Sequence, residues 1–113
     1  MDVKQVAVDS STLVERTSLL APVFSERSSS ATIRGRLDER TVMEMRETGL
    51  LRVYVPKRFG GDELHMVDVL PSVARLARGC PAAAWVLAVY QVHNWLVAFL
   101  DDAVQQVVFE NES

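Results

Sequence analysis

The stretch that decides the fold is Arg78–Leu100, with the sequence RGCPAAAWVLAVYQVHNWLVAFL. Glycine and proline near its start predict that one helix stops there and that an almost wholly apolar helix follows. Three polar side chains interrupt the apolar run: Gln91, His93 and Asn94. Polar groups inside a buried helix must hydrogen-bond to a neighbour, to water or to a bound molecule. We therefore expect the candidate functional site on this helix.

Apolar side chains surround this predicted helix on nearly all sides. One stripe at helical spacing is expected to face the domain's own core. It consists of Trp85, Val89, Val92, Leu96 and Phe99. The other faces are still mostly apolar, and a small domain cannot cover all of them. We therefore expect an exposed apolar face, with the three polar side chains set in it, that meets another protein or a ligand.

A membrane span is the alternative explanation for a run as long as Ala82–Leu100. The three polar side chains would then lie near the bilayer centre, where polar groups are costly. The far end carries Asp101 and Asp102 instead of the lysines or arginines that are typical of a membrane anchor. A helix buried in protein explains the same pattern, so no membrane partner is expected.

Composition and charge exclude several classes of protein. The chain of 113 residues is long enough for one domain, and 49% hydrophobic with 24% charged residues is ordinary for a folded one. A net charge of −3 and a pI near 5.3 argue against a nucleic-acid partner, which needs clustered basic residues. Cys80 is the single cysteine, which excludes an internal disulfide, and with two histidines it cannot form a closed zinc site. We expect no metal, and the absence of an apolar signal segment predicts a cytoplasmic location.

The whole pattern predicts a small all-α domain of about five helices. Residues 1–9 are expected to form a flexible start, and residues 10–113 a single helical domain. Capping residues and apolar spacing place helices at about 13–27, 39–48, 67–78, 82–100 and 103–110. The first is expected to be capped within Ser10–Thr12, and the second to begin after Asp38 and to end at Gly49.

The segments between and within these helices carry further expectations. Leu50–Pro56 is rich in β-branched residues and ends in proline, so it is expected to be an extended linker packed on the core. Lys57–Gly61 is expected to be a turn. The helix at about 67–78 should bury one side on the core. That side consists of Val69, Leu70, Val73, Leu76 and Ala77.

Two segments carry a resemblance to a known family. Glu47–Gly61, ETGLLRVYVPKRFGG, resembles the N-terminal helical domain of the acyl-CoA dehydrogenase superfamily, in which a Gly-Leu segment followed by Pro and Gly-Gly links the second helix to the third. Leu76–Leu87, LARGCPAAAWVL, and Val92–Trp95, VHNW, narrow the resemblance. Together they are similar to two-component flavin-dependent monooxygenases, such as the oxygenase components that hydroxylate 4-hydroxyphenylacetate and related phenols.

The resemblance implies an activity, a cofactor and a site. In this family a separate flavin reductase supplies reduced FMN or FAD, and the oxygenase uses it with oxygen to hydroxylate an aromatic or polyketide-like small molecule. The family's histidine near the flavin and the substrate matches His93, which is the catalytic candidate. Trp85, Asn94 and Trp95 are candidates for the cofactor or substrate pocket. A neutral imidazole suits the role, because it can accept a phenolic proton at neutral pH.

A full member of that family also has a β-barrel domain and a C-terminal helical bundle, neither of which this sequence contains. We therefore expect the chain alone to be incomplete as an enzyme, and a chain that binds no cofactor is one alternative. Its partners would be the missing β-domain and C-terminal bundle, or a second copy of itself. A non-catalytic helical interaction or dimerisation module and a fragment of an acyl-CoA dehydrogenase are the alternative functions.

Overall fold

The computed structural model describes residues 8–28 and 35–110. Within these ranges the chain forms α-helices and short 3-10 helices and no strand. The elements are α1 (Ser10–Glu26), α3 (Glu39–Glu47), η2 (Leu50–Arg52), η3 (Lys57–Phe59), α4 (Met66–Gly79), α5 (Pro81–Val97) and α6 (Asp102–Glu110). The prediction of an all-α domain of about five helices is confirmed. Most of the predicted flexible start at residues 1–9 lies outside the described residues.

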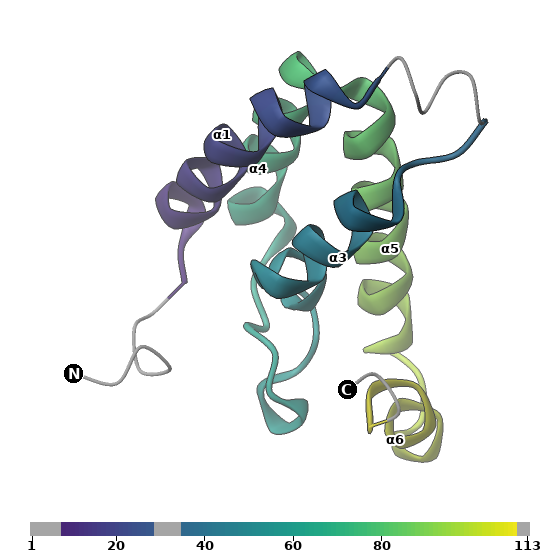
Figure 1. Ribbon diagram of the computed structural model, residues 1–113. Helices are drawn as coiled ribbons and strands as arrows, with labels where there is room; N and C mark the ends of the chain where they lie inside the picture. The colour runs from purple at the N-terminus through teal and green to yellow at the C-terminus, as the bar shows by residue number, and fades with distance from the viewer. Residues whose placement is uncertain (1–7, 29–34, 111–113) are drawn as a thin grey trace.

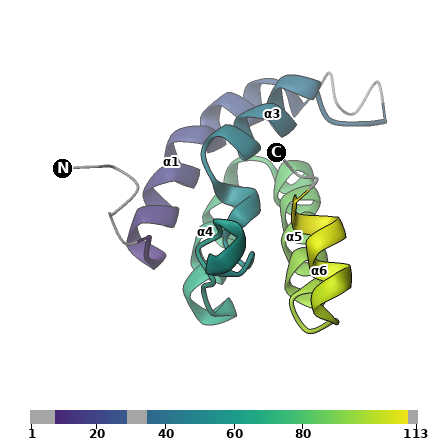
Figure 2. The same cartoon turned by 90° about the horizontal axis from the view of Figure 1, so that it is seen from below.

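The helix α4 is the centre of the arrangement, because it packs on α1 along one side and on α5 along the other. Figure 2 shows these three helices side by side, with α4 in the middle. The short helix η2 packs against both α3 and α5, and α6 lies at the far end of α5 (Figure 1). The large apolar side chains of the core come from α1, α3, η2, α4 and α5. They include Leu13, Phe24, Met45, Leu50, Leu76 and Leu87.

Two helix starts show how well capping can be predicted. The carboxylate of Asp38 accepts a hydrogen bond of 2.8 Å from the backbone N–H of Arg40, which confirms the predicted cap of α3. For α1 the predicted cap within Ser10–Thr12 is wrong by one residue. Asp9 caps this helix instead, and its Oδ1 accepts from the N–H of Thr12 at 2.8 Å. Ser10, Ser11 and Thr12 already belong to the helix. Because an N-cap residue is not itself helical, it must lie just before them.

The link after α3 differs from the predicted extended linker. Gly49 adopts the left-handed conformation that the sequence predicts, with φ of 79°. The chain then turns at once into the 3-10 helix η2, so the prediction of an extended Leu50–Pro56 is wrong. The tight turn buries Leu50 and Val53 together in the core. Here packing overrides the preference of β-branched residues for extended backbone, which is a weak and context-dependent preference.

The Gly60-Gly61 pair needs both of its glycines, for two different reasons. After η3 the chain folds back on itself, and the N–H groups of Glu63 and Leu64 donate to the carbonyls of Val55 and Val53. Gly60 takes a positive φ of 83°, which side chains rarely adopt. At Gly61 a Cβ would overlap the backbone of Val55. The predicted turn is confirmed. The close approach of Gly61 to Val55 lets the chain that follows the turn pack against the chain that precedes it.

The junction between α4 and α5 agrees with the stop and restart predicted from the sequence. The helix α4 ends at Gly79, and α5 begins at Pro81 in its first turn, where proline fits. A Cβ at Gly79 would lie 2.7 Å from the Cβ of Ala21, so the glycine lets α1 approach α4 closely. No helix in the described part of the chain is long and apolar enough to cross a membrane.

Candidate functional site

The helix α5 turns a different side to the core from the one that its sequence suggests. The predicted core stripe is wrong: Trp85 is 72% exposed and Phe99 is 73% exposed. The buried side consists of Ala83, Ala84, Leu87, Gln91 and Asn94. Since each residue advances a helix by about 100°, the two stripes differ by roughly half a turn. Apolar character alone could not choose between them, because both sides are rich in apolar residues.

Two polar side chains of the run therefore lie inside the domain. The amide of Gln91 donates to the carbonyl of Leu50 at 3.0 Å, and that of Asn94 donates to the carbonyl of Leu51 at 2.9 Å. Both acceptors belong to η2. The expectation that these polar groups need partners is confirmed. Among the residues that the structure describes, no buried side-chain nitrogen or oxygen lacks one.

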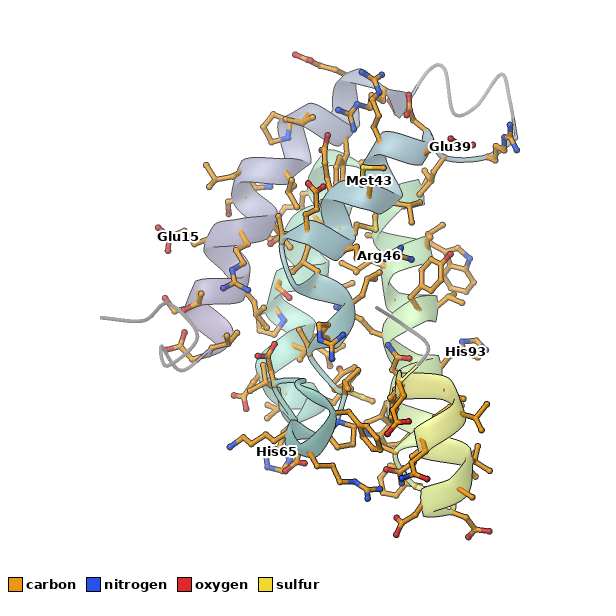
Figure 3. The ribbon with its side chains drawn as sticks, turned by 60° about the horizontal axis from the view of Figure 1, so that its bottom comes forward. Glu15, Glu39, Met43, Arg46, His65 and His93 are labelled. Carbon is orange, nitrogen blue, oxygen red and sulfur yellow. The ribbon has the colours of Figure 1, made fainter. Side chains whose placement is uncertain are left out.

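The third polar side chain, His93, is exposed and projects from α5 away from the other helices (Figure 3). Its Nδ1 lies 2.7 Å from the carbonyl oxygen of Val89, one turn back on the same helix. A carbonyl can only accept, so Nδ1 carries the proton of this hydrogen bond. The other ring nitrogen, Nε2, is thereby left as the group that can accept a proton or bind a partner.

The structure separates the four residues that the sequence assigns to the site. Trp85 lies eight residues before His93. At the rise of an α-helix this spacing is about 12 Å along the axis. Trp95 is half-buried and meets Phe99 edge-on, with ring centroids 5.0 Å apart. Asn94 points into the core. Within this chain, then, His93 and Trp85 share the outer side of α5, and the roles predicted for all four residues stay predictions.

The expectation of an exposed apolar face on this helix is confirmed, but of the three polar side chains expected in it His93 alone is exposed. We define the outer face as the exposed large apolar side chains of α5, α6 and the segment between them. It consists of Trp85, Val89, Tyr90, Val92, Leu96, Phe99, Leu100, Val104 and Val107. The helix α5 contains no charged residue over its whole length, Pro81–Val97. His93 is the polar group at the edge of this face.

Sequence reasoning missed how α6 is attached. The amide of Gln105 donates to the carbonyls of Ala98, the C-cap of α5, and of Leu100 in the segment after it, at 3.0 and 2.8 Å. Arg58 of η3 donates to the Gln105 side-chain oxygen at 2.6 Å and to Asp102 at 2.9 Å. These contacts hold the α6 part of the outer face in place.

The groups whose pKa departs from its ordinary value belong to other parts of the chain. The side chain and backbone N–H of Arg40 lower the pKa of Asp38 to about 2. Burial raises the pKa of Asp62, against the opposing charges of Arg16 and Arg52. Burial also raises the pKa of Tyr54. In the described ranges no three His, Cys, Asp or Glu side chains lie close enough together to hold a metal ion.

The sequence matches a known family over most of its length. Residues 18–107 match the family described as acyl-CoA dehydrogenase, N-terminal domain. The chain is 34% identical over 90 residues to a pigment production hydroxylase of Rhodococcus erythropolis, which covers 80% of this chain and 23% of that protein. It is 27% identical over 100 residues to the flavin-dependent monooxygenase, oxygenase subunit HsaA, of Rhodococcus jostii strain RHA1, which covers 88% of this chain and 26% of that protein.

The fold is similar to a solved structure as well. The crystal structure of 3-HSA hydroxylase from Rhodococcus sp. RHA1 superimposes with a TM-score of 0.83 at 25% sequence identity. The match covers 98% of this chain and 27% of that one. The chain thus spans about a quarter of the length of the relatives that it matches.

Proposed function

We propose, because this chain belongs to the family of acyl-CoA dehydrogenase N-terminal domains, that it is the N-terminal domain of the oxygenase component of a two-component flavin-dependent monooxygenase. The relatives named above, which are a flavin-dependent monooxygenase and two hydroxylases, support this proposal. Its substrate would be an aromatic or polyketide-like small molecule. A separate reductase would supply the reduced flavin, as FMN or FAD.

The observation that carries the proposal is the outer face with His93 at its edge. Large apolar side chains that are exposed together usually mark a surface that another protein body or a ligand covers. The face has no charged residue on α5 that would have to be desolvated when it is covered. The imidazole Nε2 of His93 is free to reach into whatever space such a cover encloses.

The residues of this face fit one wall of a flavin site and not a whole one. Flat side chains such as Trp85 and Tyr90 could lie against an aromatic ring, and His93 could hydrogen-bond to one. Small-molecule sites, however, enclose most of the ligand's surface. Because Trp85 and His93 are both open to solvent, the remaining walls must come from another body.

In the assembled site His93 would hold or move a proton at Nε2. Bound reduced flavin, together with oxygen, supplies the hydroxylating chemistry in such enzymes. The hydrogen bond from Nδ1 to the carbonyl of Val89 fixes which ring nitrogen faces outward, so the neutral imidazole presents an acceptor there. An acceptor of this kind suits a substrate hydroxyl whose proton must leave. The apolar side chains around it would exclude water.

A chimaera tests the proposal. The N-terminal domain of the Rhodococcus sp. RHA1 hydroxylase is replaced by this chain, and hydroxylated product is measured with chemically reduced flavin, oxygen and the hydroxylase's own substrate. We expect product from the chimaera and none from its His93→Ala variant. The matched control is His65→Ala, which removes the other exposed histidine and should leave product formation unchanged. A folded chimaera that binds reduced flavin but forms no product contradicts the proposal.

A non-catalytic dimerisation module is the second candidate, and the outer face favours it as well. Light scattering after size exclusion, combined with an anaerobic titration with reduced FMN, separates the two functions. Trp85→Glu should break a dimer formed through the outer face. Leu19→Glu on α1, at a side chain that is equally exposed, should leave it intact. A stable monomer at high protein concentration rules out the module, and saturable flavin binding favours the oxygenase domain.

A further inference from the structure

The rotation of α5 about its own axis is not explained by apolar burial. Apart from Leu87, the core side of the helix holds two alanines and two amides, whereas the outer side holds Trp85, Tyr90 and Leu96. Burial of the larger apolar side chains would favour the opposite rotation. Some other interaction must therefore select the rotation that the structure has.

The amides of Gln91 and Asn94 differ from two of the buried hydroxyls in what they bind. The hydroxyls of Thr17 and Ser72 donate to carbonyls of their own helices, so they do not tie one element to another. Gln91 and Asn94 instead cross from α5 to η2. These two side chains are three residues apart and so lie on one side of the helix, and their acceptors are consecutive carbonyls.

We propose that Gln91 and Asn94 are positioning residues that select the rotation of α5 and thereby turn His93 to the outer face. Two donors one turn apart, bound to two adjacent acceptors, fix both the rotation and the position of the helix along its axis. If α5 turned by half a turn, the carbonyls of Leu50 and Leu51 would face apolar side chains without these donors. The small Ala83 and Ala84 allow the close approach but bring no directional contact.

The consequence for His93 rests on the proposed function. His93 precedes Asn94, a side chain anchored in the core. Its direction is therefore offset by about 100° from that of the anchor. Loss of the anchors would let the helix sample rotations in which the imidazole no longer points outward. Gln91 and Asn94 would then affect the reaction through His93 without touching the substrate.

The test measures rotation directly on the 113-residue chain. A soluble paramagnetic compound enhances the NMR relaxation of exposed groups, and the pattern along α5 reports which side faces solvent. In the unchanged chain we expect the methyl groups of Leu96 to relax at least several-fold faster than those of the buried Leu87. In the double variant Gln91→Leu, Asn94→Leu, which keeps similar side-chain volumes, we expect this ratio to fall at least twofold.

The matched control separates rotation from mere loss of stability. Leu87→Ala weakens the core side of the same helix but leaves both amides. The same side of α5 should therefore stay exposed. Because Leu87 is absent in this variant, the methyl groups of Leu96 and Val92 are compared with those of Ala83 and Ala84. If the double variant keeps the ratio of the unchanged chain, the proposal is wrong. This readout needs no enzymatic activity, so its failure is distinct from failure of the proposed oxygenase function.

A second measurement on the unchanged chain holds even if the double variant does not fold. The side-chain amide protons of Gln91 and Asn94 should exchange with solvent at least tenfold more slowly than those of Gln106, an exposed glutamine on α6. Exchange of all three at the same rate would mean that the amides are not anchored in solution, and it would overturn the proposal.

Discussion

The neighbouring helices α4 and α5 respond differently to the same rule of sequence reading. In α4, polar residues separate the apolar positions, and the predicted buried side correctly contains Val69 and Leu76. In α5 apolar residues occur on every side, and the predicted stripe faces solvent. Apolar periodicity therefore identifies the core side of a helix only when the opposite side is polar. On α5 the choice falls to hydrogen bonds and to side-chain size.

Even on α4 the agreement has a limit. The pattern predicts a buried Leu70, which is 54% exposed, and it does not predict the burial of Ser72, which is complete. Ser72 can be buried at little cost because its hydroxyl donates to the carbonyl of Val69 at 2.6 Å. A small side chain whose hydrogen bond is made within its own helix can thus be buried completely on α4.

The largest expected effects come from leucines on the inner sides of the two helices. Both Leu76 on α4 and Leu87 on α5 are fully buried. Leu76→Ala and Leu87→Ala should therefore each lower the free energy of unfolding by about 2–5 kcal/mol. Substitution of an exposed residue on each of the same helices, Leu70→Ala and Trp85→Ala, should change the free energy of unfolding by less than about 0.5 kcal/mol. Urea unfolding followed by circular dichroism measures all four variants under the same conditions.

A reversed order of the two losses on α5 would contradict the rotation of this helix that the structure shows. A large loss for Trp85→Ala together with a small loss for Leu87→Ala would mean that the rotation derived from apolar pattern alone is the correct one. Measurement at several protein concentrations keeps self-association apart from folding, because only the former depends on concentration.

A medium effect is expected at the junction of the two helices. Gly79→Ala would place a Cβ 2.7 Å from that of Ala21. The helix α1 must then shift away from α4, at a cost of about 1–3 kcal/mol. The double variant Gly79→Ala, Ala21→Gly should lose less than the two single losses added together. Purely additive losses in thermal or urea unfolding would show that the close approach of α1 and α4 does not matter.

A smaller effect is expected at the far end of α5. Arg58→Ala removes the hydrogen bonds to Asp102 and Gln105. Because the Arg58–Asp102 pair is largely exposed, the change should cost about 1 kcal/mol or less. The effect should be local: relative to the unchanged chain, backbone hydrogen exchange should become faster in α6 and stay the same in α4.

The matched control for this change is Arg40→Ala, which removes another exposed ion pair far along the chain. It should leave hydrogen exchange in α6 unaltered. Equal effects on α6 in both variants would contradict the attachment described for Arg58.

The smallest effect concerns the start of α3, the helix that leads into η2 and so into the acceptors of the two α5 amides. The pKa of Asp38 is lowered from 3.8 to about 2, so its cap is complete above pH 3.8 and is lost as the pH falls through about 2. Asp38→Asn keeps a capping side chain that does not titrate. The unchanged chain should therefore lose stability relative to this variant between about pH 4 and 2, measured by urea unfolding. A stability difference that is the same at every pH would contradict the lowered pKa.

From the sequence alone we could predict the helical class, most helix boundaries, the cap at Asp38, the turn at Gly60-Gly61 and the presence of a polar group on an apolar helix. Local chemistry specifies these features, because capping, glycine conformation and apolar spacing act over a few residues. The sequence also indicated the family, through segments such as Glu47–Gly61.

The three-dimensional fold was needed to show which side of α5 faces the core, and with it where each candidate site residue lies. The carbonyls that anchor Gln91 and Asn94 lie more than forty positions earlier in the chain, on a 3-10 helix that β-branched residues did not predict. A hydrogen bond depends on where both partners come to rest, and no spacing within α5 contains the position of η2. By the proposal above, His93 faces outward for that reason, because Gln91, two residues before it, and Asn94, one residue after it, are held from across the fold.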